Sequence, residues 1–76
     1  MLELDIHGYT EMEAKKIIER YIASLPEDVK EFRIIHGYHK GNALKELVRD
    51  RNKIRSNRIK RKKFTMNQGE TIIELY

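Results

Sequence analysis

The tetrapeptide Ile-His-Gly-Tyr occurs twice in this chain of 76 residues, at Ile6–Tyr9 and again at Ile35–Tyr38. Each copy ends a short apolar run and precedes a segment with helical patterning. The two histidines are 36 − 7 = 29 residues apart, a length that suits one strand–helix–strand unit. Parallel strands joined in this way end at the same edge of a sheet, where open α/β sheets place their ligands. The repeat therefore predicts that both His-Gly pairs lie together at the carboxyl edge of a sheet.

Hydrophobic periodicity predicts the first strand and the first helix. Leu2, Leu4 and Ile6 alternate with polar residues, which is typical of a strand with one exposed face, and this parity puts His7 on that face with Asp5. Thr10 to Glu13 fits a capping box, so a helix begins there. The helix carries one apolar stripe and ends before Pro26; the stripe is Ala14, Ile17, Ile18, Tyr21, Ile22 and Leu25.

The second half of the chain predicts a strand over residues 32–36, a loop over 36–41 and a second helix capped by Asn42. Residues 58–64 form a lysine-rich strand, which is typical of a sheet edge. A turn at 66–69 leads to a final strand over 71–76. The order βαβαββ predicts an α/β two-layer sandwich in a single domain, residues 1–76. Strands one to three are parallel, strand four is antiparallel, and both helices cover one face of the mixed sheet.

The charge of the chain is unevenly distributed. The net charge is +4, but residues 1–31 carry 4 basic and 8 acidic side chains, whereas residues 32–76 carry 12 basic and 4 acidic ones. A one-sided basic surface is typical of proteins that bind nucleic acid. The densest run is predicted to contact phosphates without reading sequence; it is Lys60, Arg61, Lys62 and Lys63. The alternatives are charge that maintains solubility and lysines that protect the sheet edge.

Composition excludes several classes of function. The chain has no cysteine, so disulfides, thiolate nucleophiles and zinc sites built on sulfur are excluded. Its longest apolar runs are too short for a membrane span or a signal sequence. We expect a complete, soluble, cytoplasmic and monomeric protein.

Asp5 and His7 are the candidates for catalysis, because a strand places their Cα atoms about 6.5–7 Å apart on one face. Histidine is the natural acid or base near neutral pH, and Asp5 can orient it or hold a hydrated Mg²⁺ or Mn²⁺ ion. RNA supplies its own 2′-hydroxyl nucleophile, whereas DNA requires an activated water. The alternative is a hydrogen-bonded pair that fixes the end of the strand.

The loop after the second strand is the candidate anion site, because it feeds the N-terminus of a helix. Its residues, together with two residues near the last turn and the first glycine, are predicted to contact nucleic acid: Gly8, Gly37, Tyr38, His39, Lys40, Gly41, Asn42, Asn67 and Thr71. Tyr9 and Tyr38 are candidates for stacking on unpaired bases. The alternative is that the glycines serve only the turn.

Three segments together resemble the signatures of the Smr (small MutS-related) domain family: Leu4–Gly8, Ile34–Gly37 followed by Gly41 and Ala43-Leu44, and Gly69–Leu75. The loop departs from the family pattern, because it is one residue longer and lacks the middle glycine. The resemblance implies a two-layer fold with sheet order 1-2-4-3. It also implies binding of DNA or RNA and, in several members, endonuclease activity, with Asp5 and His7 central and His36 assisting.

Three functions remain open at this point: a nucleic-acid-binding endonuclease, a binding module for structured DNA or RNA that does not cut, and a protein-interaction domain associated with the ribosome. The sequence does not distinguish RNA from DNA.

Overall fold

The computed structural model describes residues 1–37, 42–50 and 52–76. Its elements follow the predicted order: β1 (Leu2–Asp5), α1 (Glu11–Ser24), β2 (Glu31–Ile35), α2 (Ala43–Arg49), β3 (Ile59–Phe64) and β4 (Glu70–Leu75). No helix within these ranges is long and apolar enough to cross a membrane.

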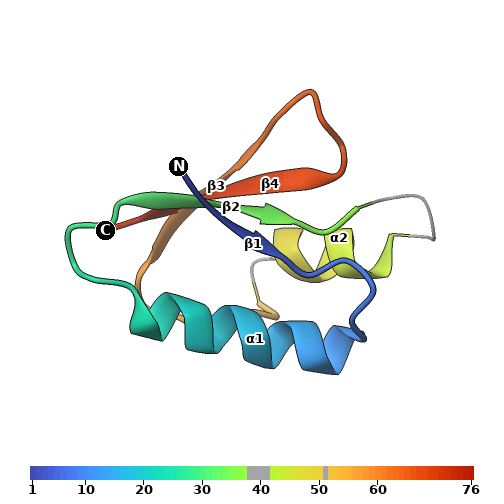
Figure 1. The fold of residues 1–76 in the computed structure, drawn as a ribbon, viewed down its shortest axis with the longest axis horizontal. Helices are drawn as coiled ribbons and strands as arrows, with labels where there is room; N and C mark the ends of the chain where they lie inside the picture. Colours follow the sequence, from blue (N-terminus) through green and yellow to red (C-terminus); the bar gives the residue numbers. More distant parts are fainter. Residues whose placement is uncertain (38–41, 51) are drawn as a thin grey trace.

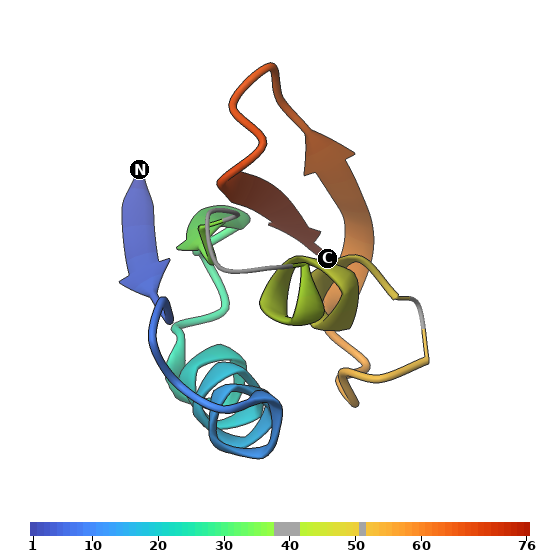
Figure 2. The same ribbon diagram turned by 90° about the vertical axis from the view of Figure 1, so that its right-hand side faces the viewer.

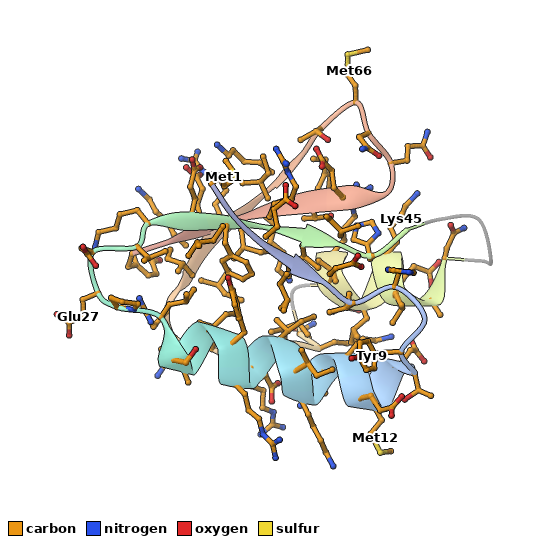
Figure 3. All side chains as sticks on the ribbon, in the orientation of Figure 1. Met1, Tyr9, Met12, Glu27, Lys45 and Met66 are labelled. Atoms are coloured by element: carbon orange, nitrogen blue, oxygen red, sulfur yellow. The ribbon has the colours of Figure 1, made fainter. Side chains whose placement is uncertain are left out.

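The strands form one mixed sheet in the order β1-β2-β4-β3 (Figure 1). β1 pairs with β2 in parallel, and β4 runs antiparallel to both β2 and β3. The predicted order 1-2-4-3 is therefore confirmed, and so is the edge position of the lysine-rich strand. The β3–β4 hairpin extends beyond the rest of the sheet, with Met66 at its tip (Figure 3).

Both helices cover the same face of the sheet, as predicted (Figures 1 and 2). The buried side chains of the central strands alternate along each strand, as expected when one face is covered and the other is open. They meet the apolar stripe of α1 and the inner side of α2 in one core. Its members are Ile6, Ala14, Ile18, Ile22, Phe32, Ile34, Leu47, Val48, Ile54, Ile73 and Leu75.

The two helices begin differently. At α1 the predicted capping box is present: the Glu13 amide donates to the Thr10 hydroxyl at 3.1 Å, and the Thr10 amide donates to the Glu13 carboxylate at 3.0 Å. At α2 the prediction that the Asn42 side chain caps the helix is wrong, because this side chain makes no capping hydrogen bond. Asn42 has φ −109° and ψ 7°, outside the extended conformation that aims a capping side chain at the first turn.

The C-terminus of α1 is held by a residue far along the chain. The guanidinium of Arg58 donates to the carbonyl oxygens of Ile22 and Leu25 at 2.7 and 2.6 Å, and to that of Pro26 at 3.0 Å. The Ile22 carbonyl also accepts the Leu25 amide at 3.2 Å, and a cation at this end of the helix complements the helix dipole. Arg58 thus fastens the segment before β3 to the end of α1.

Replacing Arg58 with methionine keeps the apolar stem and removes these hydrogen bonds. We expect Arg58→Met to lower the free energy of unfolding by about 1–3 kcal/mol, measured by urea denaturation. The control is Lys53→Met, which removes one exposed cation from the same connecting segment. Equal stability losses in the two variants would contradict this role of Arg58.

Candidate active site

Asp5 and His7 form a hydrogen-bonded pair where β1 ends. Oδ1 of Asp5 accepts the Nδ1 proton of His7 at 2.5 Å and also the backbone amide of His7 at 3.0 Å. These hydrogen bonds, the side-chain one first, lower the pKa of Asp5 below its ordinary value of 3.8, so it is a carboxylate at neutral pH. The side chain of His7 is 72% exposed. Its Nδ1 is engaged by Asp5, so Nε2 is the ring nitrogen available to a ligand.

Three segments distant in sequence meet around this pair, as predicted. The Ile6 amide donates to the carbonyl of Ile35 at 2.9 Å, which extends the pairing of β1 and β2 by one residue. A Cβ placed on Gly37 would lie 3.9 Å from the Cβ of His7, so the two His-Gly pairs are neighbours. The Gly69 carbonyl accepts the amides of His36 and Gly37 at 2.9 and 3.0 Å. We call this edge, formed by residues 5–9, 36–37 and 67–69, the rim.

The glycine of each His-Gly pair has a backbone role. Gly8 and Gly37 have φ of +84° and +72°, in the left-handed region that residues with a side chain rarely adopt. Each glycine turns the chain out of its strand just after the histidine. Tyr9 is exposed, and together with Asp5, His7 and Gly8 it lines a shallow hollow on the rim. The stacking of Tyr9 on a base stays a prediction.

His36 lies on the other face of the sheet from His7 and is 3% exposed. Its Nδ1 bonds the Gly37 carbonyl at 2.9 Å and its Nε2 bonds the Thr71 hydroxyl at 2.9 Å. A carbonyl only accepts, so Nδ1 carries the proton and Nε2 accepts from Thr71. Burial lowers the pKa of His36 below 6.5, and the cations Arg49 and Lys45 lower it further, which keeps the ring neutral.

The Thr71 hydroxyl joins His36 to α2. Nε of Arg49 donates to this hydroxyl at 3.0 Å, and an Arg49 terminal nitrogen donates to the Glu70 carbonyl at 3.1 Å. The prediction that Thr71 contacts nucleic acid is corrected, since this residue is 0% exposed and its oxygen is already engaged on both sides. Sequence reasoning missed Arg49, which lies in the last turn of α2 and faces the sheet. Only its hydrogen bonds to Thr71 and to the Glu70 carbonyl distinguish it from the other arginines, and these follow from the tertiary structure.

The basic run of β3 is divided between the two faces of the strand. Lys62 turns inward and donates to the Asp50 carbonyl at 2.8 Å, and burial lowers its pKa. Arg61 pairs with Glu74 on the open face. Lys63 lies 3.5 Å from Glu31 and 3.7 Å from Glu74 on the same face. Lys60 is exposed and lies where the β3 register shifts. The run is therefore not one continuous phosphate-binding surface.

The open face of the sheet carries both signs of charge. Arg33 lies between Glu3, at 2.7 Å, and Glu70, at 3.0 Å. With Arg61 and Lys63, this face has three cations paired to four glutamates: Glu3, Glu31, Glu70 and Glu74. Exposed pairs of this kind add little stability, but they leave no cationic excess.

The remaining predicted residues separate into two groups. Tyr38, His39, Lys40 and Gly41 lie outside the described residues. Asn67 is exposed on the rim, and its Oδ1 accepts the Gly69 amide at 2.8 Å, so it shapes the turn that reaches His36. Within residues 1–37, 42–50 and 52–76, no group of three His, Asp or Glu side chains is arranged to hold a metal ion.

A family model for the Smr domain matches residues 4–75. The chain belongs to the Smr domain family. This family comprises nucleic-acid-binding modules. The crystal structure of the Smr domain of Thermus thermophilus MutS2 matches with a TM-score of 0.85, covering 100% of this chain and 99% of that one. The two sequences are 21% identical, so this likeness shows the fold. No curated protein matches the chain.

Neutral His36 makes the stability of this Smr domain depend on pH. Because folding lowers the pKa of His36, the unfolded chain binds one more proton between that lowered value and 6.5. Stability therefore falls as the pH drops below 6.5, and this contribution is constant above it. We expect a smaller free energy of unfolding at pH 5 than at pH 7.5.

Urea denaturation at several pH values measures this effect. His36→Gln should flatten the dependence between pH 5 and 6.5, whereas His7→Gln should retain it. An NMR titration of the His36 ring in the unaltered protein reports the same pKa directly. A His36 pKa at or above 6.5 would contradict the assignment of a neutral ring.

Proposed function

We propose that this Smr domain binds nucleic acid at the rim and cleaves phosphodiester bonds with Asp5 and His7, and that RNA is the better matched substrate. One observation carries the proposal: Asp5 fixes Nδ1 of a histidine that is 72% exposed and lies beside two turns of the rim. A carboxylate that orients an imidazole in this way sets its tautomer and stabilises the imidazolium that forms during reaction.

RNA suits a single histidine because it carries its own nucleophile. Nε2 of His7 takes the proton of a 2′-hydroxyl while that oxygen attacks the adjacent phosphorus. The bond from phosphorus to the 5′-oxygen breaks, and the 5′-oxygen leaves with a proton from water or from the new imidazolium. The products are a 2′,3′-cyclic phosphate and a 5′-hydroxyl. Asp5 acts as the positioning carboxylate throughout.

DNA requires an activated water, which calls for a metal ion in most nucleases. Of the described residues, the hollow contributes one carboxylate, Asp5, whose Oδ1 already accepts two hydrogen bonds. This donor set does not fit a site with several carboxylates, which is the usual environment of Mg²⁺ or Mn²⁺ in nucleases. The donor set of the hollow therefore supports RNA cleavage by Asp5 and His7 without a metal ion.

His36 has a supporting role in this proposal rather than a chemical one. Both of its ring nitrogens are engaged inside the protein, and its amide holds the Gly69 carbonyl. It keeps the second His-Gly pair and the 67–69 turn in register with His7. An oxygen of the substrate has no access to its ring.

The second candidate is a binding module that does not cut. It is favoured by the single exposed imidazole of the described rim, since cleavage by paired histidines needs two. A module of this kind would act as a monomer on structured DNA or RNA, including ribosomal RNA. A domain that binds a protein at the ribosome is the third candidate, and the salt dependence of binding separates it from the others.

Nucleic-acid binding should weaken steeply with salt. For each phosphate that the domain contacts, the logarithm of the association constant falls by about 0.7–0.9 per unit of log salt concentration. Fluorescence anisotropy with a labelled RNA hairpin and a matched DNA hairpin, from 50 to 300 mM KCl, measures this slope. Binding that is absent, or insensitive to salt, would point to a protein partner.

Cleavage should depend on both members of the pair. His7→Gln is expected to lower the rate on labelled single-stranded RNA by about 10²–10⁴-fold, and Asp5→Asn by at least about tenfold. The control is Glu3→Gln, the same change of charge two residues earlier on β1, with an expected change under about twofold.

The same assay with EDTA and with plasmid DNA tests the metal-free route. RNA cleavage should be unchanged by EDTA and should leave a 2′,3′-cyclic end, and the plasmid should stay intact. Equal cleavage by the two pair variants and the unaltered protein would assign the activity to a contaminant. Tight binding without cleavage would establish the second candidate.

A further inference from the structure

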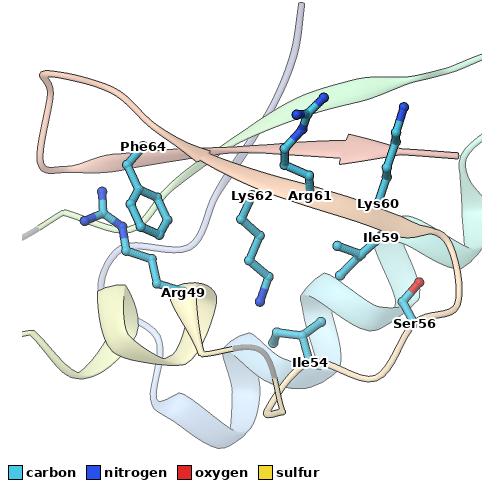
Figure 4. A pocket seen from close by; sticks show the side chains of 8 residues that line it. All are labelled: Arg49, Ile54, Ser56, Ile59, Lys60, Arg61, Lys62 and Phe64. Atoms are coloured by element: carbon cyan, nitrogen blue, oxygen red, sulfur yellow. The ribbon is translucent and has the colours of Figure 1, made fainter.

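A groove runs between β3 on one side and the C-terminal end of α2 with the segment that follows it on the other (Figure 4). It lies on the helix-covered side of the sheet, away from the hollow of Asp5 and His7. Its lining residues include no carboxylate: they are Arg49, Ile54, Ser56, Ile59, Lys60, Arg61, Lys62 and Phe64. Arg49 and Lys62 turn their charges toward this groove, so it is basic where the open face of the sheet is balanced.

Phe64 is the unusual residue of this groove, because it is 61% exposed although its strand position is on the helix-covered side. It pairs with buried Thr71 in register, but α2 does not extend far enough to cover it. The Arg49 guanidinium carbon lies 4.2 Å from the ring centroid (Figure 4). Leaving an aromatic ring in water forgoes the gain of burying it, and a ligand that covers the ring would recover that gain.

Arg49 is held in position before any ligand arrives. It uses Nε on Thr71 and one terminal N–H on the Glu70 carbonyl, which are 2 of its 5 donors. The other 3 have no assigned acceptor among the described residues. A guanidinium held in this way loses little side-chain freedom on binding, and its planar fork suits a phosphate.

Lys62 brings a second positive charge into the groove. Lys62 points into it toward Ile54, whereas Lys60 and Arg61 rise on the other side of β3 (Figure 4). Lys62 bonds the Asp50 carbonyl at the end of α2, so it cancels the negative end of the helix dipole there. The groove therefore offers an aromatic platform, Phe64, and two cations, Arg49 and Lys62, which is the composition of sites for single-stranded nucleic acid.

We propose that this groove binds a single-stranded segment of nucleic acid, with one base stacked on Phe64 and the adjoining phosphates at Arg49 and Lys62. This inference deepens the proposed function. It rests on nucleic-acid binding, and it specifies that the domain selects single-stranded over duplex nucleic acid. The bases of a duplex are stacked on each other, so a ring such as Phe64 reaches only an unpaired base. An acidic protein segment would satisfy the cations but would leave the ring without a planar partner.

Tryptophan fluorescence tests the stacking directly, since the chain contains no tryptophan. Phe64→Trp places a single indole in the groove, and Tyr76→Trp places one at another exposed aromatic position, 68% exposed and outside the groove. A 12-nucleotide oligo(U) should quench the first indole and leave the second nearly unchanged. The same backbone with abasic sugars should bind more weakly and should not quench.

Affinity provides the second measurement. Phe64→Leu should weaken binding of the single strand about 5- to 100-fold and should change binding of a 12-base-pair duplex by less than about twofold. The matched control is Tyr76→Leu, which should leave both affinities unchanged. Lys62→Gln should weaken both and reduce the salt slope by about one phosphate.

The outcomes distinguish this inference from the proposed function. Salt-dependent binding with no quenching at position 64 and no loss in Phe64→Leu would overturn the groove and leave the proposed function standing. If Phe64→Leu lost the same affinity for the single strand as for the duplex, the preference for unpaired bases would be overturned. Binding of polyglutamate as tight as that of oligo(U) would assign the groove to an acidic protein, and no binding of any nucleic acid would overturn both proposals.

Discussion

The parallel pairing of β1 with β2 determines the chemistry of the rim, because it decides which of two identical histidines is exposed. Asp5 is paired with Ile35, so Ile6 is level with His36, and His7 is level with Gly37. The two Ile-His-Gly-Tyr segments are thus out of register by one residue. In a strand, a shift of one residue exchanges the two faces. Ile6 and His36 enter the core, and His7 is left in solvent beside Asp5.

Burial of His36 has a structural consequence that extends to α2. An imidazole in the core needs partners for both nitrogens, and it obtains them from Gly37 on its own strand and Thr71 on β4. Thr71 then needs a donor, which Arg49 supplies from α2. Each member supplies the hydrogen bond that the next one needs, so the network connects the end of β2 with β4 and α2. It lies directly beneath the rim and restricts how far the 67–69 turn can move from the second His-Gly pair.

The sequence predicts the element order, the edge position of the lysine-rich strand and the meeting of the His-Gly pairs, because these follow from short-range periodicity and from the handedness of strand–helix–strand units. The full strand order comes from the resemblance to the Smr family. The burial of His36 can also be predicted from the sequence. Polar Arg33 alternates with apolar Phe32 and Ile34, and the same alternation puts His36 on the apolar side of the strand. The division of the basic run between the two faces of β3 could not be predicted from the sequence. It depends on a register shift in β3 and on glutamates of β2 and β4, which are distant in sequence.

The cations of the basic run lie on two faces of β3, and this changes how a polyanion can approach the domain. On the open face, Arg33, Arg61 and Lys63 are each paired with at least one glutamate. A phosphate chain gains little on such a face and must separate existing ion pairs to bind. On the helix-covered side, Arg49 has no carboxylate ion-pair partner among the described residues, and Lys62 donates to a carbonyl rather than to a carboxylate. Because the long-range field of a protein follows the unpaired charges, these cations direct a polyanion to the β3 edge. The short β3–β4 hairpin is therefore the element that connects the basic groove with the rim.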